Sequence, residues 1–210
     1  MKARDAAALA SLERDHRLLW GLTDALHAYV DALDGGRPLR RGDLKAIASG
    51  LRVVADYRHF EKEEEVMVPV LVRHGFDYHL QILDDGRREH HSLRYLIEVL
   101  HQSAQRELNW KLDERERISR VAHQLIERQR RLSTRQEARL FPEIVARLEP
   151  PALGQLTEQL CQFDESTAAR EPALDVAGLT RSMLAFYGTH STASLPPARE
   201  TSRRVPETAG

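Results

Sequence analysis

Two residues four positions apart carry the clearest chemical signal in the sequence. His59 and Glu63 lie within the segment Tyr57–Pro69, which has the composition of a helix. On a helix, residues i and i+4 share a face, so an imidazole and a carboxylate would point the same way. Both groups are good ligands for divalent transition metals. The pair predicts a metal site, provided that other elements bring further donors to it.

Long amphipathic helices are the elements that must supply these donors. Apolar residues at spacings of three and four predict helices over residues 9–34, 43–74, 80–104 and 114–148. Short links between long helices favour antiparallel neighbours. The sequence therefore predicts an all-α protein built on an up-down-up-down four-helix bundle, with residues 1–150 as its domain.

Histidines interrupt the apolar seams of three of these helices. His16 lies on the first seam and His90 on the third. A rise of about 1.5 Å per residue places His16 about 27 Å and His59 about 24 Å from the loop between their helices. From the next loop, Glu63 lies about 15 Å away and His90 roughly 15–18 Å away. We therefore expect His16, His59, Glu63 and His90 to share one layer and to be metal ligands.

The fourth helix lacks donors at the matching positions. Aligning Glu64–Pro69 with Glu137–Pro142 pairs His59 with Leu132, and Glu63 with Gln136. Leu132 can only fill space, whereas Gln136 offers a carbonyl oxygen or can orient a bound water. Glu137 is one residue off the seam and is not expected to replace a ligand. Three imidazoles and one carboxylate satisfy one iron, manganese or zinc ion and leave room for a small ligand on iron or manganese.

A metal-free polar network is the competing interpretation. A lone histidine on an apolar face is usually a hydrogen-bonded core residue, but a buried carboxylate among three histidines is costly without a cation or a full set of partners. We therefore favour a metal. Residues close in sequence that could tune the site are Glu13, Asp56 and Tyr57. The remaining histidines show no partner pattern or favour the surface: His27, His74, His79, His91, His101, His123 and His190.

Composition excludes several other classes of site. The 210 residues carry 31 Lys and Arg against 32 Asp and Glu, so no net field draws the chain to nucleic acid or to a membrane. Cys161 is the single cysteine, which excludes an internal disulfide framework and a Cys-rich metal site. No apolar run reaches the ~18 residues of a membrane span, and no signal peptide is readable. We expect a cytoplasmic protein without nucleic-acid or membrane partners.

The region after the bundle divides into two parts. Apolar stripes over residues 153–163 and 174–186 predict a helical extension, residues 151–190, packed on the bundle. Residues 191–210 are rich in Ser, Thr, Pro and Arg without apolar periodicity, which predicts a disordered tail.

With His16, the run His59–Glu64, Glu89-His90 and Leu140-Phe141-Pro142 in place, the chain resembles a hemerythrin-like domain of the HHE cation-binding class over about residues 5–150. The resemblance implies a four-helix bundle with a non-haem di-iron centre held by histidines and bridging carboxylates. Proteins of this class bind oxygen, sense iron or oxygen, or act on nitric oxide or peroxide.

The resemblance also implies roles for single residues. His16 would be the ligand from the first helix, His59 and Glu63 those from the second, with Glu63 as a bridge, and His90 that from the third. The histidine and carboxylate of the fourth helix fall on Leu132 and Gln136, which removes two ligands from the second iron.

We therefore expect a metal-binding protein with one non-haem iron ion rather than two, zinc or manganese being the other candidates, that binds or senses oxygen, nitric oxide or peroxide. The alternative is a metal-free, degenerate bundle that acts as an interaction or regulatory module. No nucleophile–base constellation or nucleotide-binding loop is readable, so any enzymatic role would be redox chemistry at the metal. The sequence is compatible with a homodimer. It does not identify any other protein partner of the chain.

Overall fold

The computed structural model describes residues 9–76, 80–105, 110–170 and 175–188, and no strand occurs among them. In chain order the elements are α2 (Ala10–Asp34), α3 (Arg41–Leu51), η1 (Arg52–Phe60), η2 (Glu63–Met67), α4 (Val68–Arg73), α5 (Leu80–Gln105), α6 (Leu112–Arg135), η4 (Gln136–Leu140), α7 (Phe141–Arg147), α8 (Pro150–Arg170) and α9 (Val176–Tyr187). The segments η1, η2 and η4 are π-helical, with a wider turn than the α-helices that they continue.

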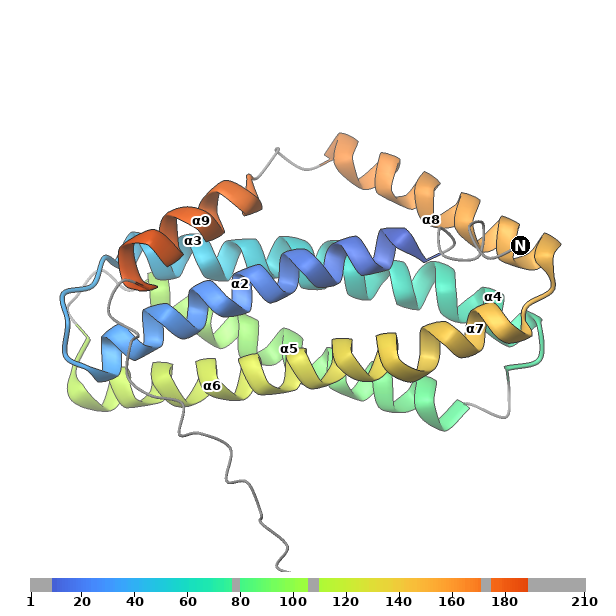
Figure 1. Cartoon of the computed structure of the whole chain (residues 1–210). Coiled ribbons are helices and arrows are strands. Elements are labelled where there is room, and N and C mark those ends of the chain that lie inside the picture. Colours follow the sequence, from blue (N-terminus) through green and yellow to red (C-terminus); the bar gives the residue numbers. More distant parts are fainter. Residues whose placement is uncertain (1–8, 77–79, 106–109, 171–174, 189–210) are drawn as a thin grey trace, which may run out of the picture.

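Four rods of helix lie side by side in the bundle (Figure 1). The first rod is α2, the second is the run from α3 to α4, the third is α5, and the fourth is the run from α6 to α7. Successive rods run in opposite directions, and their ends fall close to the predicted ranges. The predicted all-α, up-down-up-down bundle is confirmed.

Proline follows the π-helical turns of the second and fourth rods at matching positions. Pro69 comes after η2 and Pro142 after η4, each as the second residue of the next α-helix. Proline has no N–H and its ring crowds the carbonyl one turn earlier, so a helix that continues through it must widen or bend. Glu63 and Gln136 are the first residues of these two widened segments, which makes the two rods structurally equivalent at this level.

The apolar core is divided into two clusters along the bundle axis. One cluster contains the part of α2 from Leu19 onward, and the other contains Leu12 of α2 and Leu9, which precedes the helix. The other three rods are divided at the same level, between Phe60 and Met67, between Leu83 and Leu93, and between Leu132 and Leu140. Five buried polar residues from the four rods meet at this level: His16, His59, Glu63, His90 and Gln136. We call these five residues the polar layer.

Two further helices cover the bundle. Helix α8 packs its buried Leu156 and Leu160 against one of the two core clusters, and α9 packs Val176, Met183 and Tyr187 against the other. The Tyr187 hydroxyl donates to Asp43 Oδ2 at 2.5 Å. Helices α8 and α9 are thus additional helices after the bundle. The predicted tail, residues 191–210, lies outside the described residues.

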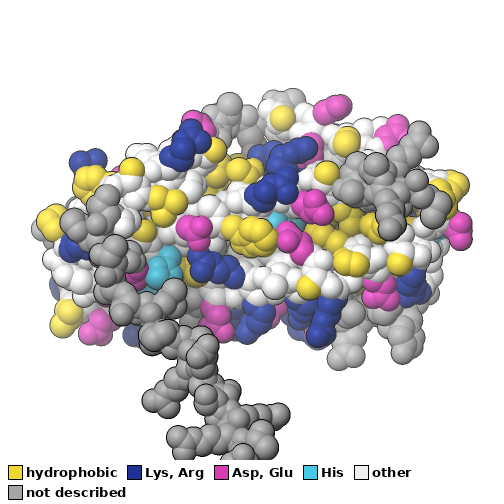
Figure 2. Space-filling model, viewed as in Figure 1, with side chains coloured by type: hydrophobic (Ala, Val, Ile, Leu, Met, Phe, Trp, Pro, Cys, Tyr) yellow, Lys and Arg dark blue, Asp and Glu magenta, His cyan; other side chains and the backbone are white. Residues whose placement is uncertain are grey.

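Charges of both signs are interspersed on the face seen in Figure 2, so no extended region of one sign dominates it. In the part of the chain that the structure describes, none of the helices combines the length and the apolar character that crossing a lipid bilayer would require.

Candidate metal centre

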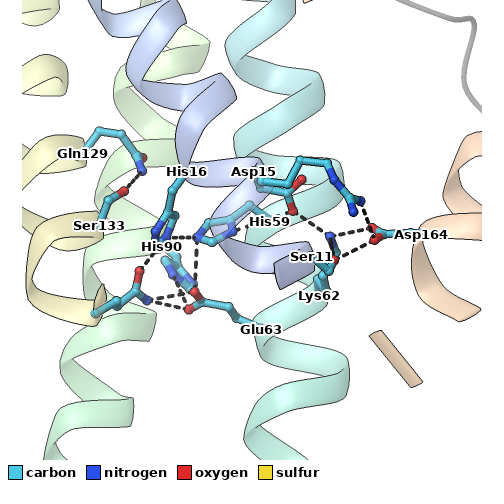
Figure 3. A network of polar contacts seen from close by, with 12 residues as sticks. Ser11, Asp15, His16, His59, Lys62, Glu63, His90, Gln129, Ser133 and Asp164 are labelled. Carbon is cyan, nitrogen blue, oxygen red and sulfur yellow. Dashed lines mark hydrogen bonds and ion pairs between the residues drawn. The ribbon is translucent and has the colours of Figure 1, made fainter. Parts of the chain in front are cut away.

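The polar layer brings together the four residues predicted as ligands. His16 comes from α2, His59 from η1, Glu63 from the start of η2 and His90 from α5. Their side chains point toward one another inside the bundle (Figure 3). None is more than 3% exposed.

Glu63 lies at the centre of this arrangement. Its Oε1 is 3.1 Å from His59 Nε2, and its Oε2 is 3.3 Å from His90 Nε2. His16 Nε2 is 3.1 Å from His59 Nε2. His16, His59 and Glu63 offer ligand atoms within 4.8 Å of one another, a spacing that one metal ion can bridge.

Each imidazole turns its other nitrogen toward a carboxylate outside the layer. His16 Nδ1 donates to Glu137 Oε1 at 2.8 Å, and His90 Nδ1 donates to Glu64 Oε1 at 2.8 Å. His59 Nδ1 faces Asp15 Oδ2 at 3.9 Å, an ion-pair distance that is too long for a hydrogen bond. A proton held on Nδ1 leaves the lone pair on Nε2, aimed at the centre. Metal-binding histidines are commonly oriented by carboxylates in this way.

The outer carboxylates were not predicted from the sequence. Glu13, Asp56 and Tyr57 were expected near the site, but the groups on the imidazoles are Asp15, Glu64 and Glu137. Each of the three directly adjoins a residue of the polar layer, and that adjacency was the available signal. Asp56 acts one step further out, since it pairs with Arg94, and Arg94 in turn donates to Glu64.

Rings stacked on two of the histidines hold them in place. The His90 ring stacks on Phe60 with centroids 4.2 Å apart, and the His16 ring stacks on Phe141 at 5.4 Å. Both phenylalanines are buried. Stacking and the carboxylate contacts together fix the direction of the two Nε2 atoms.

Gln136 closes the fourth side of the layer. Its amide nitrogen donates to both oxygens of Glu63 at 2.8 Å, and its Oε1 is 3.1 Å from His16 Nε2. With the His16 proton on Nδ1, the lone pair of His16 Nε2 faces a lone pair of Gln136 Oε1, which is unfavourable. Rotating the Gln136 amide by 180° would instead place its oxygen against the Glu63 carboxylate. A cation at the centre would relieve this conflict. Leu132, 2% exposed, only fills space, as predicted.

His90 Nε2 is a further sign that the donor set suits a cation. It is buried and has no hydrogen-bond partner among the described residues, because its approach to Glu63 lacks hydrogen-bond geometry. A buried polar atom without a partner is uncommon and costly. Imidazole nitrogens around a carboxylate are donors that iron, zinc and manganese accept. The residues present therefore fit a single divalent ion.

The layer requires a positive charge at its centre. Burial would raise the pKa of Glu63, but His59 and His90 lower it, so this residue stays a carboxylate. Burial and the neighbouring His59 lower the pKa of His16 to about 4. Burial alone would also lower the pKa of His59, yet Glu63 and Asp15 raise it to about 9. Without a metal, a proton on His59 therefore provides the charge near neutral pH.

A buried lysine connects the layer to helix α8. Lys62, fully buried, places its Nζ 2.6 Å from Asp15 Oδ2, 2.5 Å from Asp164 Oδ1 and 2.7 Å from Ser11 Oγ (Figure 3). Asp164 belongs to α8, and Asp15 faces His59. In the sequence, Lys62 looks like part of an exposed charged run from Glu61 to Glu65, so its burial under α8 was not foreseen.

The other described histidines lie away from the layer. His27, His74, His91 and His123 are exposed, and His101 is partly buried. The rings of His27 and His123 approach each other at the surface, with centroids 6.1 Å apart. His79 and His190 lie outside the described residues.

Comparison with models of protein families identifies the family of the chain. Residues 7–144 match the family model described as hemerythrin HHE cation binding domain. The matched range contains the whole polar layer, the outer carboxylates and Lys62. Searches of curated proteins and of solved structures returned no match.

Replacing Lys62 should destabilise the protein as long as its partner Asp15 stays charged. In metal-free protein, Lys62→Met should lower the free energy of unfolding by about 3–5 kcal/mol, because it leaves the Asp15 carboxylate buried without its counter-ion. Adding Asp15→Leu should recover most of that loss, since both charges are then gone. Urea unfolding with a chelator present measures both variants. Equal stability of the single variant and the wild type would contradict the assignment.

The raised pKa of His59 predicts opposite pH dependences for stability and metal affinity. In metal-free protein, the stability from its proton is complete below the ordinary pKa of 6.5 and is lost as the pH rises through about 9. A metal needs the neutral imidazole, so its affinity should rise by up to about tenfold per pH unit over the same window. Calorimetry at pH 7 in buffers of different ionisation enthalpy should show that ion binding releases protons. Absence of proton release would count against this scheme.

Proposed function

Since the chain belongs to the hemerythrin HHE cation-binding family, we propose that its polar layer binds one divalent metal ion, with non-haem iron as the physiological metal. His16, His59, Glu63 and His90 are the proposed ligands. The observation that carries the proposal is the direction of the imidazoles: all three Nε2 atoms face the Glu63 side of the layer, while all three Nδ1 atoms face carboxylates. Zinc and manganese accept the same donors and are the competing metals.

One ion is favoured over two by the fourth rod. Leu132 supplies no donor, and the Gln136 amide hydrogens are directed at both oxygens of Glu63. Glu137 is the nearest carboxylate on that rod, but it accepts from His16 Nδ1 on the outer side of the ring. The described residues thus leave a second ion without ligands on this side.

The bound ion would be used to bind or sense a small ligand, for which we propose oxygen, nitric oxide or peroxide. Four protein donors leave one or two positions on five- or six-coordinate iron. The bound iron would supply the redox chemistry. The protein contributes a largely apolar environment through Leu132, Phe60 and Phe141.

We propose that the protein functions in the reducing environment of the cytoplasm. A site for ferrous iron is compatible with a reducing compartment, and Cys161 is an exposed free thiol. The single cysteine offers no structural disulfide within the chain.

The metal-free module is the second candidate, and one observation favours it. Gln136 already satisfies both oxygens of Glu63, and a proton on His59 can supply the missing charge. Under this hypothesis, His16→Leu or His90→Leu should leave the stability unchanged or raise it, because apolar replacement of a buried polar network is often neutral or favourable.

Metal analysis separates the two candidates. After anaerobic loading with ferrous iron and removal of excess metal, the wild type should hold about one iron per chain and His59→Ala close to none. His123→Ala, which removes an exposed histidine on α6, is the matched control and should load like the wild type. A wild type that retains no more iron than His59→Ala would overturn the proposal and favour the metal-free module.

Restoring donors on the fourth rod tests the proposed count. The double variant Leu132→His, Gln136→Glu places an imidazole and a carboxylate on the open side of Glu63, so the metal content should rise from about one ion per chain to about two. Elemental analysis with an ultraviolet-visible spectrum of the iron-loaded variant measures this. Unchanged content with an intact fold by circular dichroism would show that the fourth rod does not set the number of ions.

A further inference from the structure

A cavity of about 240 Å³ leads from the polar layer to the surface between η2, α5 and η4. Its floor is formed by Glu63, His90 and Gln136, three members of the polar layer. An apolar cavity of about 150 Å³ already accommodates benzene. The present cavity is therefore larger than a diatomic gas or peroxide requires.

The walls of this cavity are hydrocarbon over most of their depth. The apolar lining residues, all of them buried, are Met67, Val68, Leu83, Leu132 and Leu140. Such a lining favours a ligand that has an apolar part of matching length. Scaling from the six carbons of benzene in about 150 Å³ gives about ten non-hydrogen atoms for this volume.

The mouth of the cavity is positively charged. Arg87 and Arg139 are exposed, Arg135 is partly exposed, and all three line the cavity. Within the described part of the chain, the guanidinium groups of these three arginines form no hydrogen bond or ion pair.

The acidic residues of the lining do not cancel this charge. Asp85 pairs with Arg88, at 2.7 Å. Glu64 is held by Arg94 and by His90. Glu63 is buried, whereas Arg87 and Arg139 are exposed and Arg135 is partly exposed.

We propose that this cavity binds an amphipathic anion, a carboxylate with an unbranched chain of about eight carbons. Its head group pairs with Arg135 and Arg139 at the mouth, and its chain lies along the apolar walls with its end toward His90 and Gln136. The orientation follows from charge, because the Glu63 carboxylate on the floor repels an anionic head group. Guanidinium groups pair well with carboxylates through two parallel hydrogen bonds.

The anion site rests on the proposed function at one point: the end of the hydrocarbon chain would lie beside His90 and Glu63, which are proposed metal ligands. Head group and walls require no metal, so the anion should bind to both the metal-free and the metal-loaded protein. Binding of the anion and binding of iron can therefore fail separately.

Octanoate, with ten non-hydrogen atoms, is the probe. Calorimetric titration of the full chain, metal-free and iron-loaded, should show one site. Affinity should increase about fourfold per methylene from butanoate to octanoate, and should not increase further to dodecanoate, because the cavity is full. Octanol, with the same chain and no charge, should bind about tenfold to hundredfold more weakly than octanoate.

Arginine variants test the head-group contact. The double variant Arg135→Gln, Arg139→Gln should lose about tenfold to hundredfold in octanoate affinity. Arg131→Gln is the matched control: it lies on the same helix, pairs with Glu89 and Glu127, and does not line the cavity. Its affinity for octanoate should equal that of the wild type.

Three results would overturn the proposal: no octanoate binding, equal binding of octanol, or an unchanged affinity of the double arginine variant. Iron content measured on the same samples keeps the two proposals apart. If the wild type binds octanoate as expected but retains no iron, the metal proposal alone fails. If it retains iron but binds no octanoate, the anion proposal alone fails.

Discussion

The buried carboxylate of Glu63 is the constraint on which the rest of the structure depends. A carboxylate in an apolar interior is costly unless positive charge and hydrogen bonds compensate it. His59 and His90 approach its two oxygens, and the Gln136 amide donates to both. The pKa values of His59 and His90 are both raised by neighbouring carboxylates, so an imidazole proton supplies positive charge beside Glu63. A divalent ion bound by the same atoms would replace that proton, so folding and metal binding share one requirement.

The packing of the bundle places the residues of the polar layer at the same level along its axis. Apolar clusters above and below it pack all four rods, and the gap between the clusters falls at the same level on each rod. On the second and fourth rods, a π-helical segment begins at Glu63 and at Gln136 and is followed by a proline six residues later. The widened turns place these two residues opposite each other, within hydrogen-bonding distance.

The sequence predicted the fold, and it predicted that His16, His59, Glu63 and His90 share one layer, because polar residues on an apolar seam are conspicuous. His16 and His90 each interrupt a regular spacing of leucines, and counting residues from the loops is enough to align them with His59. The outer groups could not be found in this way. Asp15 and Lys62 lie off the seams, where charged residues normally face water. The burial of Asp15 and Lys62 becomes visible only in the structure, where α8 packs over Lys62. The residue periodicity of one helix does not indicate which other helix covers it.

Two residues of the fourth rod, Leu132 and Gln136, affect both the metal site and the cavity beside it. Leu132 and Gln136 occupy the positions where the family resemblance places further ligands, and the same two residues line the cavity beside Glu63 and His90. A histidine and a carboxylate there would extend the polar layer into this space and place another negative charge on the floor. With an aliphatic and an uncharged side chain instead, the space remains apolar up to the arginines at its mouth. The lack of an imidazole and a carboxylate at these two positions and the apolar character of the cavity therefore have the same structural origin.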